Sequence, residues 1–365
     1  FAYFYTPNIF NTIANEENID TMIGSIPSFS EIGMNTGSAY QEKTDLFTPH
    51  GDGHPALTDV TVRRAIRMAI SSEELNEKVM LGLGIPGTTI IPPVSVEGAR
   101  WEPEGDELIA WDIEGANALL DEAGYEDTDG DGVREMPPGS LDPGRPLEFR
   151  YYTRTSEQTS VDAASFVSEW LEQIGIATNV EAISSGKLGD IINEGTYELF
   201  SWGWIPDPDP DSALSWFTCD QRPPDGSTYG NNDSYYCNPE YDELYHQQRV
   251  ELDPEARWEI VHEMQRIYYN DAAYAIMWYD PVLSAWRTDR FTGYVPQPEP
   301  NGDPLEGWGG VSEVWYTLRP VGAGAGSSAD TSGIPAAVWL VVLGVVIILA
   351  AILIARSRRS SEDEA

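Results

Sequence analysis

The sequence predicts an α/β protein followed by one membrane-spanning helix at the C-terminal end. Strand-like and helix-like periodicities alternate from residue 147 to residue 202, which favours a mostly parallel sheet with covered faces. Residues 336–355 form an apolar run of about 20 residues, long enough to cross the hydrocarbon core of a bilayer. Residues 322–333, between these regions, have the Gly, Ser and Ala composition of a flexible linker.

The first predicted elements are helices. Residues 58–80 contain two helical pieces with an apolar face, and Ser71 with Glu74 forms a capping box that opens the second piece. Another helix is predicted over residues 112–123, because Asp112 is a natural N-cap and a glycine follows the last apolar position.

The remaining elements alternate in type along the chain. Apolar positions switch between a period of two, typical of strands, and a helical period. The predicted elements are strand 147–153, helix 157–174, strand 176–183, helix 186–193, strand 197–202, helices 239–250 and 254–270, and strand 273–278.

The C-terminal apolar run also predicts a topology. A cluster of arginines directly follows it, and such a cluster marks the cytoplasmic end of a membrane helix: Arg356, Arg358 and Arg359. We therefore expect a linker at 321–334, a transmembrane helix at 335–355 and a cytoplasmic tail at 356–365, with the preceding residues outside the cell. A buried hydrophobic helix is the alternative interpretation of the apolar run.

The composition is strongly acidic. The chain has 60 acidic and 21 basic residues and a formal net charge of -39, which repels phosphates and so argues against a nucleic-acid partner. With 41% hydrophobic and 11% aromatic residues, it is nevertheless a folding sequence. We interpret this acidic, lysine-poor composition as salt adaptation of the haloarchaeal kind. An acidic surface that serves one cationic ligand is the alternative.

Two cysteines lie near each other in the sequence. An exported domain is in an oxidising compartment, where two cysteines such as Cys219 and Cys237 commonly pair, and two free thiols are the alternative. Between them, Asn232, Asp233 and Ser234 form a glycosylation sequon, which we expect in an exposed turn.

One segment resembles a calcium-binding loop. Asp127, Asp129 and Asp131 occupy positions 1, 3 and 5, and Gly132 occupies position 6, where such a loop turns sharply. Position 12 is Pro138, so the bidentate glutamate of a full EF-hand is missing. The two interpretations are a structural calcium site and a solvated Asp/Gly turn.

Sequence motifs of enzymes are mostly missing. The chain has no Gly-rich phosphate loop with its lysine, no nucleophile elbow and no pair of histidines at metal-binding spacing. We therefore expect neither nucleotide chemistry nor a transition-metal site.

A cluster of carboxylates follows the last strand of the alternating pattern. Trp202 and Trp204 are followed by Asp207 and Asp209, at the end of a strand where open α/β sheets bind ligands. An aspartate there can pair with a ligand ammonium, and the tryptophans can wall the pocket. The alternatives are the acid/base pair of a glycosidase and a Pro/Asp turn on an acidic surface.

Several segments, in a fixed order, carry a resemblance to a known family. The region 57–70 resembles the signature of family 5 solute-binding proteins of ABC transporters, the oligopeptide- and dipeptide-binding receptors. The similarity covers nearly all of residues 30–320 and continues through 91–93, 119–125, 147–152, 170–176, 203–209, 237–242, 291–295 and 318–320.

The resemblance implies a periplasmic-binding-protein-like fold of type II, with two lobes that close around a ligand at a hinge. Residues 1–56 would then be a first-lobe remnant with the hinge at 33–36, residues 57–280 the second, ligand-binding lobe, and residues 281–320 the return to the first lobe. The family's N-terminal half is absent and the chain begins at Phe1 without a signal peptide, so we expect an incomplete N-terminus.

The resemblance also implies the binding residues. By alignment, the aspartate that holds a peptide's α-ammonium falls on Asp207, with Asp209 as second choice, and the family pairs the two cysteines that correspond to Cys219 and Cys237. The family also binds nickel chelates, haem, glutathione and oligosaccharides, so membership alone does not name the ligand.

We therefore predict a monomeric, membrane-anchored extracytoplasmic receptor that captures di- and oligopeptides and delivers them to an ABC permease and its ATPases. It performs no covalent chemistry, and it needs no cofactor apart from the calcium considered above. The expected binding residues are Asp207, Asp209, Trp202 and Trp204. Oligosaccharide binding, with Trp216 as a further stacking face, is the alternative. A surface hydrolase with paired carboxylates and a structural surface protein are the other classes considered.

Overall fold

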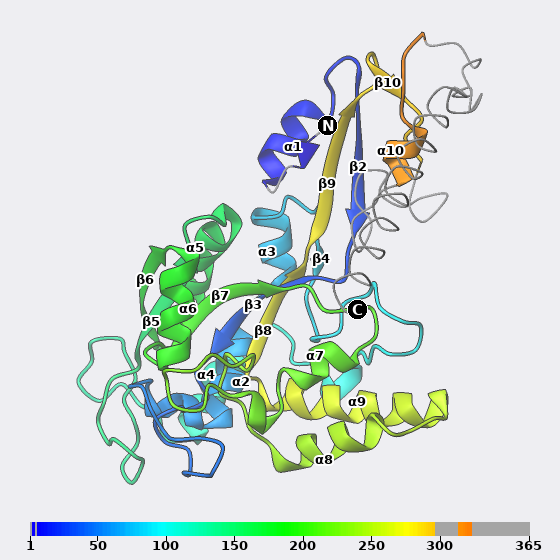
Figure 1. The fold of residues 1–365 in the computed structure, drawn as a ribbon. Helices are drawn as coiled ribbons and strands as arrows, with labels where there is room; N and C mark the ends of the chain where they lie inside the picture. The colour runs from blue at the N-terminus through cyan, green and yellow to red at the C-terminus, as the bar shows by residue number, and fades with distance from the viewer. Residues whose placement is uncertain (1, 4–5, 296–312, 323–365) are drawn as a thin grey trace, which may run out of the picture.

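The main body of the protein is a six-stranded sheet with helices packed on both faces (Figure 1). The computed structural model describes residues 2–3, 6–295 and 313–322. The strand order is β4-β8-β3-β7-β5-β6. In chain order these strands are β3 (Phe29–Met34), β4 (Ile85–Pro86), β5 (Glu148–Arg154), β6 (Ala177–Ile183), β7 (Leu199–Trp204) and β8 (Tyr274–Tyr279).

The predicted βαβαβ unit forms one half of this sheet. It consists of β5, α5 (Gln158–Glu172), β6, α6 (Ser185–Glu194) and β7, with β5 lying between the other two strands and parallel to both. Because parallel strands end at the same edge, Arg154 at the end of β5 and Trp204 at the end of β7 lie at one edge of the sheet.

The other half of the sheet is antiparallel, so the expectation of a mostly parallel sheet is wrong. β3 lies between β7 and β8 and runs antiparallel to both, and β4 is antiparallel to β8. No strand was predicted at β3, because Glu31 and Gly33 interrupt its apolar pattern. Because β3 was not predicted, the order of the strands in the sheet could not be derived from the alternation of strands and helices.

The predicted helices form with the expected caps. Helices α2 (Val60–Ala69) and α3 (Ser72–Lys78) replace the two pieces predicted in 58–80, and the Ser71 hydroxyl accepts the Glu74 N–H at 3.1 Å. The Asp112 carboxylate accepts the Gly115 N–H at 2.8 Å at the start of α4. The remaining helices of the main body are α4 (Ile113–Glu122), α7 (Asp211–Ser215), α8 (Pro239–Gln248), α9 (Pro254–Asp271), η1 (Pro55–Thr58), η2 (Gly105–Glu107) and η3 (Cys219–Gln221).

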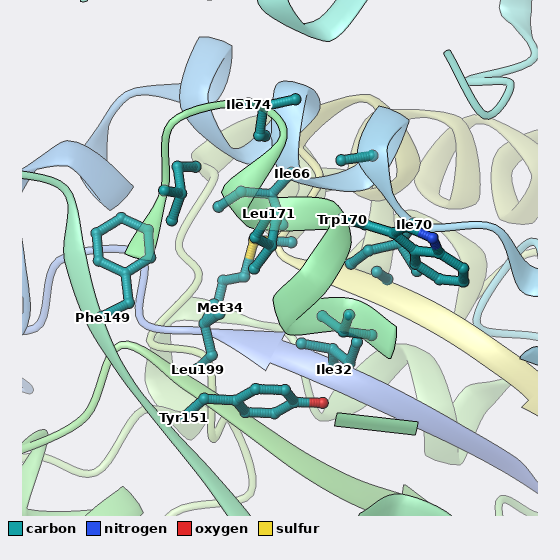
Figure 2. Close-up of a cluster of buried hydrophobic side chains, with 14 of the residues drawn as sticks. Ile32, Met34, Ile66, Ile70, Phe149, Tyr151, Trp170, Leu171, Ile174 and Leu199 are labelled. Atoms are coloured by element: carbon teal, nitrogen blue, oxygen red, sulfur yellow. The ribbon is translucent and has the colours of Figure 1, made fainter. Parts of the chain in front are cut away.

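The two faces of the sheet carry different cores. Alternate residues of β3 point to opposite faces, so Ile32 and Met34 pack with Leu199 and Leu171 in the mainly aliphatic cluster that Figure 2 shows. Phe29 belongs to the opposite face, where the cluster is mainly aromatic and includes Phe200, Phe217, Tyr235, Tyr268 and Tyr274. Glu31 is on this aromatic face, because it shares the alternation of Phe29.

A smaller sheet extends from the main body, seen at the top of Figure 1. Its order is β1-β9-β2, and both partners of β9 are antiparallel to it. The elements of this part are β1 (Ala2–Tyr3), α1 (Pro7–Ile13), β2 (Ile19–Ser25), β9 (Pro281–Arg287), β10 (Phe291–Thr292), α10 (Glu313–Thr317) and β11 (Arg319–Pro320).

The chain changes from one sheet to the other at two points. β2 leads into β3 through residues 26–28, and β8 leads into β9 through Asp280. The Asp280 carboxylate joins the two crossings, since it accepts hydrogen bonds from Ser28 Oγ at 3.0 Å, Ser30 Oγ at 2.9 Å and Trp278 Nε1 at 2.9 Å. The hinge expected at 33–36 falls at the end of β3, within the main sheet.

In the described part of the chain, no helix combines the length and the hydropathy that a membrane span requires. The predicted transmembrane helix at 335–355 lies outside the described residues, as do the tail at 356–365 and most of the linker.

Candidate functional site

The predicted tryptophans lie on the aromatic face of the main sheet, near the edge where the parallel strands β5 and β7 end. Trp202 and Trp204 are two residues apart on β7, so both point to the same face, and both are partly exposed. Trp204 stacks on Trp216, which follows α7, with ring centroids 4.5 Å apart and planes 30° apart. The structure therefore brings all three tryptophans to one side of the sheet.

The two predicted aspartates have different surroundings. Asp207 is exposed, and no bond to its carboxylate is found within the described residues, although its N–H donates to Ser212 Oγ at 3.0 Å. Asp209 is held by Arg257 of α9, whose two terminal nitrogens lie 2.8 and 2.7 Å from its oxygens. This bidentate contact lowers the pKa of Asp209. Of the two, only Asp207 has a carboxylate free for a ligand.

The structure adds a residue that the sequence analysis missed, Arg154 at the end of β5. Its guanidinium carbon lies 4.4 Å from the centre of the Trp202 ring, a cation–π contact. In the described part of the chain, its side chain forms no ion pair, and its buried Nε has no hydrogen-bond partner. The rule that ligands bind at the carboxyl ends of parallel strands could have identified it, because it ends the strand next to β7.

Two buried acids beneath the tryptophans were also missed. Glu31 is fully buried, and burial, reinforced by the nearby Asp233 carboxyl, raises its pKa well above the usual range. Asp233 is also buried, which raises its pKa to about 7 although the Tyr274 hydroxyl donates to it. Nothing in the sequence distinguishes these two among 60 acidic residues.

The segment that contains Asp233 is fixed by the predicted disulfide. Cys219 and Cys237 are bonded, as expected. The expectation that the sequon lies in an exposed turn is wrong, because Asn232 is fully buried and its Nδ2 donates to the carbonyls of Thr218 at 3.1 Å and Tyr236 at 2.7 Å. The amide that would carry a glycan is therefore used inside the protein.

The predicted calcium loop brings its carboxylates together. Asp127, Asp129 and Asp131 are joined by Glu135, and one oxygen from each lies within 4.8 Å of the others. Glu135 is at position 9 of the loop, where a calcium loop often uses a ligand. The carboxylates also accept loop N–H groups, as Asp127 does from Gly130 and Gly132, so a turn without an ion is equally well satisfied. Calcium binding stays a prediction.

A cavity among the described residues lies away from these side chains. It has a volume of about 360 Å³ and is lined by Arg67, Trp111, Tyr269 and residues at the start of α3. None of the predicted binding residues lines it.

The chemistry of the site is that of binding. It offers a guanidinium, a free carboxylate and aromatic faces, all near one sheet edge. A glycosidase acid must hold its proton near neutral pH, which requires a raised pKa. The pKa of Asp209 is lowered instead, because Arg257 binds its carboxylate, so Asp209 does not have the electrostatics of the acid in such a pair.

Known proteins resemble the chain in both sequence and fold. The probable di/tripeptide-binding protein 5 of Pseudomonas aeruginosa is 27% identical over 251 residues, which cover 67% of this chain and 42% of that protein. The periplasmic alpha-galactoside-binding protein of Rhizobium meliloti is 30% identical over 132 residues, covering 36% of this chain and 18% of the relative. The chain thus spans less than half the length of these curated relatives.

A solved structure has the same fold. The oligopeptide-binding protein AppA of Bacillus subtilis, in complex with a nonapeptide, superposes with a TM-score of 0.64 at 21% identity over 81% of this chain and 53% of that one. The model of the family described as bacterial extracellular solute-binding proteins, family 5 Middle, matches residues 1–224. Since this match covers more than half of the chain, the protein belongs to family 5 of the extracellular solute-binding proteins.

Proposed function

We propose that the protein is the extracytoplasmic receptor of an ABC importer and that it captures short peptides by their two charged ends. The observation that carries this proposal is that two opposite charges follow neighbouring parallel strands and have no ion-pair partner among the described residues: the Arg154 guanidinium at the end of β5 and the Asp207 carboxylate after β7. A peptide offers a carboxylate to the first and an ammonium to the second.

The strength of such contacts supports a role for both residues. Charge-assisted hydrogen bonds are stronger than neutral ones, and a guanidinium binds a carboxylate through two parallel N–H groups. Stacking on Trp202 orients the guanidinium and leaves its N–H groups in the plane where a carboxylate binds. The di/tripeptide-binding relative from Pseudomonas aeruginosa supports the same ligand class.

Oligosaccharide binding is the second candidate, and the alpha-galactoside-binding relative favours it. A sugar would need open aromatic faces. One face of Trp204 is covered by Trp216, and Arg154 covers a face of Trp202, so two stacking surfaces are already in use. A neutral sugar would also leave the Arg154 charge unpaired, and we therefore favour a peptide.

The cellular setting is proposed on sequence grounds. We propose anchoring in the cell membrane by residues 335–355, a monomeric receptor outside the cell, delivery to a membrane permease with ATPase subunits, and a salt-adapted surface. Family membership supports the transport role.

The test is a titration of the full-length protein, followed by tryptophan fluorescence in concentrated salt. Trp202, Trp204 and Trp216 lie at the site, so a bound ligand should change their emission. We expect saturable changes with di- and tripeptides and none with oligosaccharides. A saturable response to oligosaccharides alone would replace peptide transport with carbohydrate uptake.

A further inference from the structure

A cation, an aromatic ring and an anion form a row across the main sheet. β5 pairs with β7 up to Tyr152 and Phe200, and two residues beyond this pair the Arg154 guanidinium of β5 lies over the Trp202 ring of β7. Trp202 in turn pairs with Glu31 of β3. Side chains directly across neighbouring strands point to the same face, so Arg154, Trp202 and Glu31 form one continuous row on the aromatic face.

The acidic member of this row, Glu31, has no hydrogen-bond partner among the described residues. Glu31 is 0% exposed, and neither of its carboxylate oxygens has a hydrogen-bond partner among the described residues. Buried polar atoms are nearly always paired, because leaving one unpaired costs its full desolvation free energy. A carboxyl with both oxygens unpaired therefore indicates a group that is bound there in the working protein.

The groups around Glu31 do not supply that partner. Asp233 and Asp280 are acids, and both raise its pKa. The Tyr274 hydroxyl donates to Asp233. Arg154 is the one cation that acts on Glu31, but it lies over Trp202 and forms no hydrogen bond with it. The surroundings are thus net acidic and lack a donor for Glu31.

Two further polar atoms on this face are unmatched. Trp204 Nε1 and Arg154 Nε are buried, and neither forms a hydrogen bond of good geometry within the described residues, although Trp204 lies near enough to Asp233 to lower its pKa. Unmatched donors and acceptors from β3, β5 and β7 therefore gather around Trp202.

Resting on the proposed peptide-binding function, we propose that this row is a subsite for a basic C-terminal residue of the bound peptide. Arg154 binds the α-carboxylate, the aliphatic stem extends past Trp202, and Glu31 receives the side-chain cation. Neighbouring strands are about 4.8 Å apart, so the backbones at Arg154 and Glu31 are separated by roughly 10 Å. Because both side chains extend from their strands, the distance between their charged groups can be shorter. The four-carbon stem of lysine suits this span.

Binding of the ligand cation changes the protonation of Glu31. Without a ligand, the surroundings of Glu31 favour its protonated, neutral form. The incoming ammonium or guanidinium favours the carboxylate, so the Glu31 proton passes to solvent as the cation binds. Binding of a peptide with a basic C-terminal residue therefore releases protons, whereas binding of a peptide with an uncharged side chain of the same length releases none.

The test compares alanyl-lysine with alanyl-norleucine, which has the same stem without the charge. Affinities and heats are measured by calorimetry on the full-length protein, in two buffers of different ionisation enthalpy, so that proton release is read directly. We expect alanyl-lysine to bind at least about tenfold more tightly, as for one charge-assisted hydrogen bond, and to release protons as it binds.

Variants identify the residue responsible. Glu31→Gln should keep the affinity for alanyl-norleucine but lose both the lysine preference and the proton release. Glu148→Gln removes an exposed carboxylate at the other end of β5 and should change neither. Equal affinities of the unmodified protein for the two dipeptides would overturn the inference and leave peptide binding intact, and this comparison needs no variant. A lysine preference that persists in Glu31→Gln would also overturn it. If neither dipeptide binds, the proposed function fails as well.

Discussion

The guanidinium carbon of Arg154 lies 4.4 Å from the centre of the Trp202 ring, and no carboxylate of the described residues forms an ion pair with this side chain. Arg154 is partly exposed at the carboxyl end of β5. Arg257 is instead neutralised by Asp209 through two hydrogen bonds. We interpret this contrast as a charge on Arg154 that is available to a ligand.

Replacing Arg154 by glutamine should weaken the binding of peptides with a free carboxylate by about 1.5 to 3 kcal/mol, the usual contribution of a hydrogen bond to a charged group. Isothermal titration calorimetry with a dipeptide and its C-terminal amide measures the effect, and the amide should lose little. Arg257→Gln is the matched control, because its guanidinium is bound to Asp209. Equal losses for the two peptides would contradict the role of Arg154.

Asp207→Asn should weaken peptide binding by about 1.5 to 3 kcal/mol, because it removes the charged acceptor for the α-ammonium. The same calorimetric titration with an N-acetylated peptide provides the comparison, since that peptide has no ammonium and should bind both proteins equally. An unchanged affinity of Asp207→Asn for the free peptide would refute the assigned role.

His54 should make the protein less stable in mild acid. Burial, assisted by the nearby charge of Arg145, lowers its pKa from 6.5 to about 4 in the folded protein. Between these pH values the unfolded chain binds a proton that the folded protein does not, so the stability present above pH 6.5 is lost as the pH falls toward 4. The full effect is at most about 3 kcal/mol.

Urea unfolding of the unmodified protein and His54→Asn between pH 7 and pH 4 checks this prediction. Asparagine keeps an acceptor for the Ala56 N–H but does not titrate. Glu31 and Asp233 titrate alike in both proteins, so the difference between the two curves isolates His54. A difference that does not change with pH would contradict the account.

Removing the disulfide should destabilise the protein by roughly 3 kcal/mol, as expected for a loop closed by residues 18 apart in sequence. The double variant Cys219→Ser with Cys237→Ser, unfolded in urea, measures this. Since the disulfide closes the segment that contains Asp233, the variant should also bind peptide more weakly. Unchanged stability would show that packing around Asn232 fixes this segment by itself.

Calcium should raise the melting temperature if the loop 127–135 binds it, because an ion that binds only the folded state adds to stability by mass action. The measurement is thermal unfolding with EDTA and then with increasing calcium. Asp129→Asn with Asp131→Asn should remove the response, and Glu148→Gln should not. A melting temperature independent of calcium would leave a solvated turn as the interpretation.

Much of the fold follows from local sequence signals, because caps and periodicity act over a few residues. The capping hydrogen bonds of Ser71 and Asp112 and the βαβαβ unit are examples. β3 could not be predicted in the same way. Its position between β7 and β8 depends on long-range pairing, and its buried Glu31 contradicts the usual rule that strand interiors are apolar.

The site was predicted in part. The carboxyl-end rule pointed to Trp202, Trp204 and Asp207, and those assignments remain predictions until they are tested. The Asp209 carboxylate binds Arg257, which lies 48 residues later in the sequence, on α9. The spacing of residues in the sequence could not predict this contact. The carboxyl-end rule could have identified Arg154, whereas Glu31 became a candidate only when the register aligned β3 with β7.

The central claim is that the protein binds a peptide by both of its charged ends. The most direct measurement is the affinity of the full-length protein for one dipeptide in four forms: free, N-acetylated, C-amidated and blocked at both ends. We predict that each single block weakens binding by about tenfold or more and that the doubly blocked form binds least. Equal affinity for all four forms would contradict recognition by charge at Arg154 and Asp207.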